Sequence, residues 1–226
     1  MNASRSVGDN KIPIDPRRLR FLADSRSPPC PRAIRNCALT GAGAAYCWAQ
    51  GPLGYSTGGP SGSDPFSTTP RTVQGRLAFS KVAAGRYHTC ALTSAWAAFC
   101  WSSLFGGQCD GTETISTTPT ACQGRLVFTT MALGVFHACG LTVDGSAYCW
   151  GRNSAGNLGD NSTTNRSSPV LVQGGLKFTA LAAGKKHTCG LTAAGATYCW
   201  GAIDDRTSAP GAIINYGPVP KAVKSP

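Results

Sequence analysis

A pair of short apolar stretches joined by a turn recurs four times along the chain. In the third copy, residues 139–142 (Cys-Gly-Leu-Thr) and 146–150 (Ser-Ala-Tyr-Cys-Trp) flank the turn 143–145 (Val-Asp-Gly). Alternating apolar positions on both sides of a three-residue turn predict a β-hairpin. The last residue of such a turn has a left-handed backbone, which favours glycine because glycine has no Cβ. Gly145 and Gly195 occupy this position in the third and fourth copies.

The register of this hairpin sorts its side chains into two faces. Cys139 lies opposite Cys149, on the same face as His137, whereas Trp150 lies opposite Ala138 on the other face. A large aromatic residue thus faces a small one, and neither face is predominantly polar. Both faces are therefore expected to be buried, which a radial stack of small four-stranded sheets achieves.

The unit that contains the hairpin repeats at a nearly constant spacing. The first cysteines of the four copies, Cys37, Cys90, Cys139 and Cys189, lie 53, 49 and 50 residues apart. This period predicts an all-β fold, a β-propeller built of about four 50-residue blades. The blades are expected at approximately residues 31–75, 76–124, 125–174 and 175–223, after a basic and disordered leader at residues 1–30.

The cysteines indicate an oxidising compartment. The hairpin register predicts four identical cross-strand disulfides, namely Cys37–Cys47, Cys90–Cys100, Cys139–Cys149 and Cys189–Cys199. Cys109 and Cys122 stand where the third copy has Leu158 and Val172, so they form either a fifth bridge or two buried thiols. We therefore expect an extracellular or periplasmic protein. The alternative is a cytoplasmic protein with reduced core cysteines, since residues 1–36 show no apolar signal segment.

Nearly half of the net positive charge lies in the N-terminal 36 residues. The chain has 21 basic and 10 acidic residues, and residues 1–36 hold +5 of its net charge of +11. Among those residues, only Phe21 supplies an aromatic ring, so a stacking platform for nucleic acid is missing. Nucleic acid is expected to bind only through non-specific contact with the leader. No apolar run is long enough for a membrane span.

Several fixed positions of the unit resemble a known repeat. Residues 182–201 (Ala-Ala-Gly-Lys-Lys-His-Thr-Cys-Gly-Leu-Thr-Ala-Ala-Gly-Ala-Thr-Tyr-Cys-Trp-Gly) and 153–160 (Asn-Ser-Ala-Gly-Asn-Leu-Gly-Asp) resemble the regulator of chromosome condensation repeat, in its cysteine-bearing bacterial form. The resemblance covers about residues 31–223. It implies a β-propeller, usually of seven blades, whose members serve as guanine-nucleotide exchange factors, secreted β-lactamase inhibitors, photoreceptors or interaction scaffolds. Family membership alone does not determine function.

The chain departs from the family pattern in three respects. The first repeat has Arg32 and Arg35 where the others have a glycine and a histidine, and the second has Trp96 at the left-handed turn position. A tryptophan there costs about 1 kcal/mol relative to glycine or forces a different turn. Only four blades can be counted, which leaves open a closed ring of four, a partial ring that self-associates or binds a partner, and a truncated reading of a longer gene.

No catalytic, cofactor or metal site is expected. His137, Cys139 and Cys149 share a face, but no C-x-x-C occurs and no fourth zinc ligand is evident. The chain also has no G-x-S-x-G elbow, no recurring carboxylate pair and no phosphate-binding glycine loop. The histidines are expected to hydrogen-bond the backbone of a neighbouring blade. The recurring histidines and tryptophans are thus interpreted as structural: His88, His137, His187, Trp48, Trp101, Trp150 and Trp200.

Two function hypotheses follow from this reading. The first is a non-enzymatic, exported interaction scaffold that binds a protein partner through the loops after each tryptophan, at residues 49–69, 102–118, 151–168 and 201–217. The alternative, implied by the resemblance, is a regulator of a small GTPase similar to a guanine-nucleotide exchange factor.

Overall fold

The chain forms an almost entirely β structure. The computed structural model describes residues 36–49, 67–101, 109–112, 116, 118–205 and 212–223. The predicted leader, residues 1–30, lies outside the described residues. A single 3-10 turn, η2 (Gln123–Arg125), is the helical element of the described part. No helix within these ranges has the length and apolar character needed to cross a membrane.

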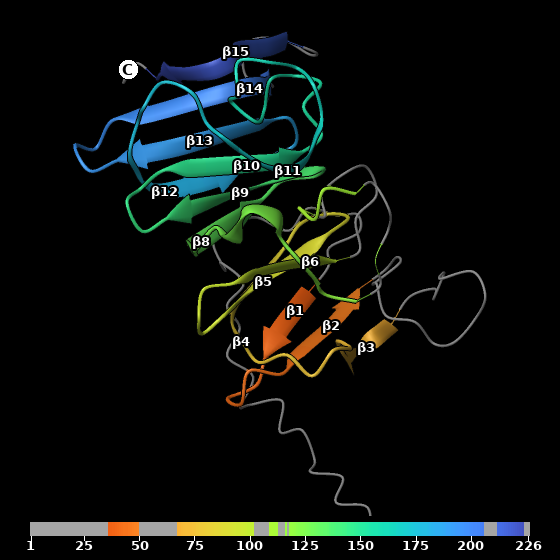
Figure 1. Ribbon diagram of the computed structural model, residues 1–226. Coiled ribbons are helices and arrows are strands. Elements are labelled where there is room, and N and C mark those ends of the chain that lie inside the picture. Colours follow the sequence, from red (N-terminus) through yellow and green to blue (C-terminus); the bar gives the residue numbers. More distant parts are fainter. Residues whose placement is uncertain are drawn as a thin grey trace, which may run out of the picture.

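Consecutive strands form four antiparallel sheets (Figure 1). The first sheet has three described strands and each of the others has four, always paired in chain order. The first contains β1 (Asn36–Leu39), β2 (Ala45–Ala49) and β3 (Ser67–Thr72), and the second contains β4 (Phe79–Ala84), β5 (Thr89–Thr93), β6 (Ala98–Trp101) and β7 (Thr120–Ala121). The third contains β8 (Phe128–Leu133), β9 (His137–Thr142), β10 (Ala147–Gly151) and β11 (Arg166–Leu171), and the fourth contains β12 (Phe178–Ala183), β13 (His187–Thr192), β14 (Thr197–Asp205) and β15 (Ala212–Ala222).

The central hairpin of each sheet has the predicted register. Cys139 pairs with Cys149 and Ala138 with Trp150 in the third sheet, and the other sheets repeat this pairing. Gly145 has a φ of +79°, and its N–H donates to the Thr142 carbonyl at 3.0 Å to close the turn. Trp96 adopts the same left-handed conformation, with a φ of +63°. The second hairpin therefore keeps the turn type and accepts the steric cost of a side chain there.

All four cross-strand cysteine pairs are disulfides, and Cys109–Cys122 is a fifth. The Thr142 N–H donates to the Ser146 carbonyl, so this opposed pair of residues is joined by backbone hydrogen bonds. Such bonds join every second pair along the hairpin, and Cys139–Cys149 is one of the pairs without them. Side chains approach most closely at such pairs without backbone hydrogen bonds. The Cα atoms of the four cross-strand pairs are accordingly only 4.0 to 4.1 Å apart.

The core consists of three layers, each lying between two sheets. One side of a layer is the disulfide face of a sheet, and the other is the aromatic face of the next sheet. In the third layer, the Cys139–Cys149 disulfide and Leu141 pack against Phe178 and Trp200. Burial of both faces, which the sequence predicts, is thus achieved by stacking sheet on sheet.

The aromatic faces of the second, third and fourth sheets each combine a tryptophan with a phenylalanine from the first strand of the sheet. The ring centroids of Phe128 and Trp150 are 5.7 Å apart, and Trp150 is fully buried. A Cβ at Gly140 would lie 2.5 Å from the Phe128 ring, so this position requires glycine for the ring to fit. Trp101 and Trp200 are also fully buried, whereas Trp48 in the first sheet is half-buried.

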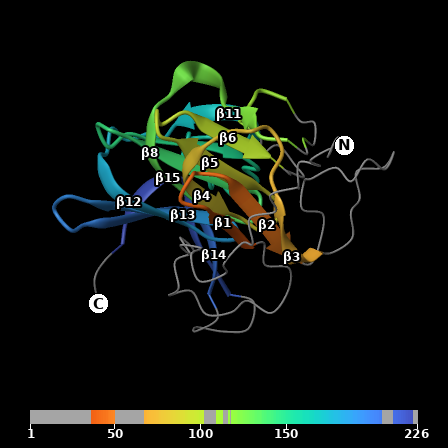
Figure 2. The same ribbon diagram turned by 90° about the horizontal axis from the view of Figure 1, so that it is seen from below.

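The described sheets are arranged as blades of an open β-propeller rather than as a closed ring of four. Figure 1 shows the first and fourth sheets at opposite ends of the stack, and Figure 2 views it from the end at which the first sheet lies. Leu191 of the fourth sheet is 40% exposed, whereas its counterpart Leu141 is 2% exposed. The disulfide face of the fourth sheet is therefore not covered by the first, which excludes closure by these four sheets alone.

Replacing both Cys139 and Cys149 with alanine should lower the free energy of unfolding by about 2 to 3 kcal/mol, because the ten-residue loop that they close then contributes its full entropy to the unfolded chain. Denaturant unfolding followed by tryptophan fluorescence measures the change. An unchanged midpoint for the double variant would show that this disulfide does not stabilise the sheet. The single variants are avoided because each leaves a reactive thiol.

Candidate functional site

The three histidines that the sequence predicts to be structural lie at the second strand of their sheets. His137 and His187 are the first residues of β9 and β13, and His88 directly precedes β5. His88 and His137 are 1% and 0% exposed, and His187 is half-buried. The His137 Nε2 lies 2.8 Å from the Thr188 hydroxyl oxygen. Thr188 donates its own hydrogen to the Asn157 carbonyl at 3.0 Å. Because a hydroxyl has one hydrogen, Thr188 must accept from His137, and the Nε2 of the ring carries the proton.

His137 is neutral in the folded protein. Burial, and to a smaller extent the nearby charge of His187, lower its pKa from 6.5 to about 4, against a backbone hydrogen bond to His187 that raises it. The ring therefore bonds to the neighbouring sheet as predicted, through a side-chain hydroxyl as well as through backbone. Its Nδ1 is buried without a partner among the described residues, and its Nε2 joins the third sheet to the fourth.

The loop between β10 and β11, residues 152–165, contains a polar cluster that the sequence analysis did not assign. The Asn153 amide donates to the Asp160 carboxylate at 3.0 Å and accepts from the Leu158 backbone N–H at 2.9 Å. Asp160 also accepts from the Ser162 hydroxyl and from the Arg166 Nε at 2.8 and 2.9 Å. Burial raises the pKa of Asp160, but these hydrogen bonds outweigh it and hold the pKa below its usual value.

This cluster fixes the shape of the loop. Asn153 is fully buried, and Leu158 beside it is fully buried in the third core layer. Every polar group of the cluster has a partner within the loop or on β11. The sequence signal was available, since Asn153 and Asp160 bracket the glycine-containing stretch that carries the family resemblance, but their buried contacts depend on the fold.

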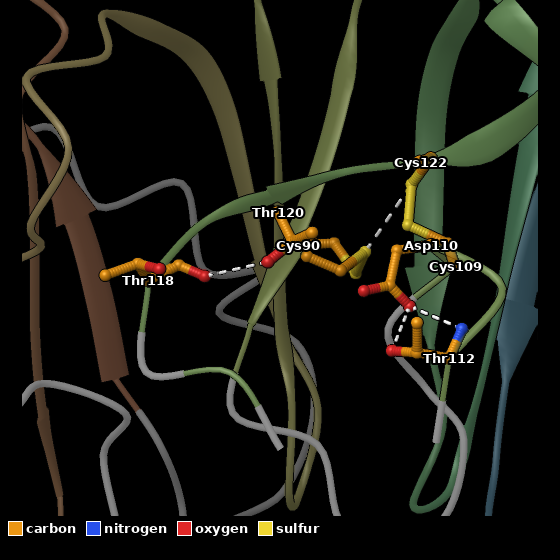
Figure 3. Close-up of a disulfide and its surroundings, with 8 residues drawn as sticks. Cys90, Cys109, Asp110, Thr112, Thr118, Thr120 and Cys122 are labelled. Atoms are coloured by element: carbon orange, nitrogen blue, oxygen red, sulfur yellow. Dashed lines mark hydrogen bonds between the residues drawn. A yellow bond between two sulfur atoms is a disulfide. The ribbon is translucent and has the colours of Figure 1, made fainter. Parts of the chain in front are cut away.

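The fifth disulfide occupies the equivalent loop of the second sheet (Figure 3). Cys122 does correspond to Val172, but Cys109 corresponds to Gly159 and not to Leu158 as the sequence alignment indicated. Cys109 has a φ of +54° and Gly159 a φ of +71°, and each carbonyl accepts from the glutamine that follows Cys122 or Val172. A Cβ at Gly159 would lie 3.0 Å from the Val172 side chain. The side chain of Cys109 leaves the backbone in the direction of this Cβ and reaches Cys122. The disulfide therefore stands where the third sheet has the contact between Gly159 and Val172.

Sulfur atoms gather around this disulfide. The Sγ atoms of Cys100 and Cys122 are 3.9 Å apart, and Cys100, Cys109 and Cys122 lie close enough together to resemble a metal site. Figure 3 shows the Cys109–Cys122 bond beside Asp110, which accepts from Thr112. All three cysteines are in disulfides, and a disulfide sulfur offers no thiolate to a metal. The cluster is therefore part of the core.

The described loops of the second and third sheets lie on the same side of the molecule. The Gly111 N–H donates to the Ser167 carbonyl on β11, and the Asn161 N–H donates to the Pro218 carbonyl on β15, both at 3.0 Å. Each loop thus reaches the last strand of the next sheet in the same way. We call residues 109–112 and 152–165 the loop face. Of the predicted binding loops, residues 50–66, 102–108, 113–115, 117 and 206–211 lie outside the described residues.

The loop face presents small polar side chains on a fixed backbone. Ser154, Thr163 and Thr164 are exposed, while the charged Asp160 is held inside the loop by Arg166. The exposed side chains of the loop face can form hydrogen bonds with a partner, whereas Asn153 and Asp160 are bonded within the loop and to Arg166.

The low pKa of His137 should make the fold sensitive to acid. The unfolded chain binds a proton near pH 6.5 and the folded one only near pH 4, so stability falls as the pH drops through this interval, by up to about 3 kcal/mol. Denaturant midpoints measured from pH 7 to pH 4 test this. The His137→Gln variant keeps a donor for Thr188 and should flatten the curve, whereas His187→Gln should retain most of the slope. Equal slopes for wild type and His137→Gln would contradict the assignment.

Comparison with known proteins finds similarity to one repeat family. Two models of the regulator of chromosome condensation (RCC1) repeat match residues 144–191 and residues 128–157. No curated protein sequence matches the chain.

Three solved structures share the fold at low sequence identity. Yeast RCC1 (Prp20) bound to Kap60 is 23% identical, with a TM-score of 0.67 over 84% of this chain and 47% of that one. Human WBSCR16 is 17% identical, with a TM-score of 0.69 over 84% of this chain and 50% of that one. Prp20p from Saccharomyces cerevisiae, whose binding to Gsp1p and histones was studied with its structure, is 18% identical, with a TM-score of 0.53 over 85% of this chain and 62% of that one.

The chain spans about half the length of the first two of these proteins. The residues matched by the two models lie in the third and fourth sheets, and the other two sheets repeat the same hairpin register and the same disulfide. Two of the recurring units therefore match the RCC1 repeat, the other two share their hairpin register and disulfide, and the four sheets have the fold of blades of an RCC1-like β-propeller.

Proposed function

We propose that this protein is a non-enzymatic interaction scaffold that works in an oxidising compartment outside the cytoplasm and binds a protein partner through its loop face. One observation carries the proposal: the buried histidine between the third and fourth sheets and the carboxylate inside the loop face are both hydrogen-bonded within the fold. His137 bonds to Thr188 across two sheets, and Asp160 bonds to Asn153 and Arg166 within a loop. What the loop face leaves exposed is suited to recognition.

The compartment is inferred from the disulfides. Ten of the eleven cysteines are paired, and three of the four cross-strand pairs are buried inside a core layer. Such bonds persist in secreted and periplasmic proteins and are reduced in the cytoplasm. The same observation counts against a regulator of a cytoplasmic GTPase, for which paired cysteines bring no benefit.

The nature of the partner is inferred from the fold. Yeast RCC1 was solved bound to Kap60, and the binding of Prp20p to Gsp1p and histones was examined. Proteins with this fold thus bind other proteins. At the identities found here, this supports a protein as the class of partner and does not indicate which one.

Purification of the chain after export to the periplasm should give one free thiol per molecule under denaturing conditions, because ten cysteines are bonded and one remains. A thiol-reactive chromophore with and without prior reduction measures the count. Eleven thiols in freshly isolated protein would rule out an oxidised scaffold. The exchange-factor alternative is tested separately, by nucleotide release from a panel of small GTPases, which should not accelerate.

The role of the loop face is tested by a photo-crosslinking group on the surface of the full chain, expressed in its source cell. Placed at Ser154 or Thr163, it should capture a discrete protein, because these exposed residues lie on the loop face. Placed at Val143, which is 85% exposed at the opposite end of β10, it should capture much less of the same protein. Equal capture from both ends of the sheet would show that the loop face is not the binding surface.

A further inference from the structure

Three turns that join the first and second strands of their sheets lie side by side. We call them the turn row, and they comprise residues 85–87, 134–136 and 184–186. A Cβ at Gly85 would lie 2.7 Å from the Gly134 carbonyl oxygen, and a Cβ at Gly134 would lie 2.5 Å from that of Gly184. The Val135 N–H also donates to the Gly184 carbonyl at 3.3 Å. Adjacent turns are thus in contact, because each glycine leaves no side chain between them.

The turn row carries two stacked aromatic rings, each with an arginine over it. The ring centroids of Tyr87 and Phe136 are 4.8 Å apart, and the ring planes differ by 12°. The Arg86 guanidinium lies 5.2 Å from the Tyr87 ring centroid, and the Arg152 guanidinium lies 5.4 Å from that of Phe136. Both arginines are exposed. Each guanidinium is thus positioned by a ring, while its residue remains open to solvent.

Positive charge predominates where the turn row meets the loop face. Arg152 belongs to the loop face, and its N–H donates to the Phe136 carbonyl of the turn row at 2.9 Å. The third turn adds Lys185 and Lys186, both exposed. The turn row and the loop 152–165 together hold four basic residues and one acidic residue, Asp160. Asp160 is already bonded to Arg166.

The two arginines come from sheets inside the stack. Arg86 follows the first strand of the second sheet, and Arg152 follows the third strand of the third sheet. A core layer lies on each side of both sheets. Neither arginine therefore lies on a sheet that has an uncovered face.

We propose that the turn row and the adjoining loop face bind an acidic segment of the partner protein, with Arg86 and Arg152 donating hydrogen bonds to its carboxylates. This inference rests on the proposed function and specifies the chemistry of the partner. A guanidinium can donate two parallel N–H groups to one carboxylate. A guanidinium that a ring already holds in place loses less freedom on binding, so that more of the interaction energy contributes to affinity.

The rings favour an acidic protein over a nucleic acid. Single-stranded nucleic acid binds basic grooves in which its bases stack on aromatic side chains. Tyr87 and Phe136 already stack on one another, and each also has a guanidinium over its ring. A base would have to displace one of these contacts in order to stack, whereas a carboxylate can bind the arginines and leave the rings in place.

The first experiment measures binding of a short fluorescent polyglutamate peptide to the full chain at physiological salt, by fluorescence anisotropy. Replacing both arginines, with Arg86→Glu and Arg152→Glu, should raise the Kd at least about tenfold, because two attractive pairs become repulsive. The matched control is Arg76→Glu with Arg125→Glu, which changes the net charge equally. Both control residues are exposed and precede the six-residue strands β4 and β8, at the opposite end of the same two sheets. The control should leave the Kd nearly unchanged.

A photo-reactive group on the same peptide locates its binding surface. Mass spectrometry of the digested product should place the attachment within the turn row or the loop face. Attachment confined to the basic residues 1–36 would overturn the proposal, as would equal losses of affinity in the two double variants. An oligothymidylate of the same charge that binds more tightly than the peptide, and loses this affinity in the Arg86 and Arg152 double variant, would assign the surface to nucleic acid instead. Near-ultraviolet circular dichroism shows that the variants keep their tertiary packing.

The second experiment separates this inference from the proposed function. A photo-crosslinking group at Ser154 of the full chain should capture a protein whose attached segment is rich in aspartate and glutamate, and the Arg86 and Arg152 double variant should lose this capture. Capture that persists in the double variant would overturn the inference and leave the proposed function standing. Absence of capture by the chain without these substitutions would overturn the proposed function and the inference together.

Discussion

The packing of a disulfide face against an aromatic face is the contact on which this structure depends. A single sheet cannot bury its own side chains, and both faces of its hairpin are apolar. Stacking solves both problems at once, because Trp150 covers the Cys90–Cys100 disulfide in one layer and Trp200 covers Cys139–Cys149 in the next. Large aromatic side chains contribute much of the buried area in such layers, and the disulfides hold the opposing strands at the spacing that the rings need.

This contact also explains where polar groups are tolerated inside the protein. Thr188 is fully buried opposite Trp200, and its hydroxyl accepts from His137 and donates to the Asn157 carbonyl. Asp160 is held in the same way by Asn153, Ser162 and Arg166. Buried polar groups are retained at low cost only when they are hydrogen-bonded, and here the bonds connect neighbouring sheets or fix a loop against one. The polar groups of these residues are thus engaged in joining parts of the fold.

The difference between the two faces of a sheet also determines which side chains lie at the ends of the stack. A repeat whose two faces differ can grow in one direction only, since a disulfide face fits an aromatic face and not another disulfide face. Leu191 on the disulfide face of the fourth sheet is exposed, and Trp48 on the aromatic face of the first sheet is half-buried. Whether a fold of this kind ends in a ring is therefore decided by what lies against these two faces.

The sequence by itself determined the hairpin and its consequences. A three-residue turn with glycine at its end sets the register, and the register places Cys139 opposite Cys149 and Trp150 opposite Ala138, all local effects of backbone geometry. Only the tertiary structure decided contacts between units. The register could not show that Thr188 links His137 to a loop, that Cys109 takes the backbone position of Gly159, or that the fourth sheet leaves Leu191 uncovered. These depend on how one sheet lies on the next, and a pattern repeated along the chain carries no information about the angle between its copies.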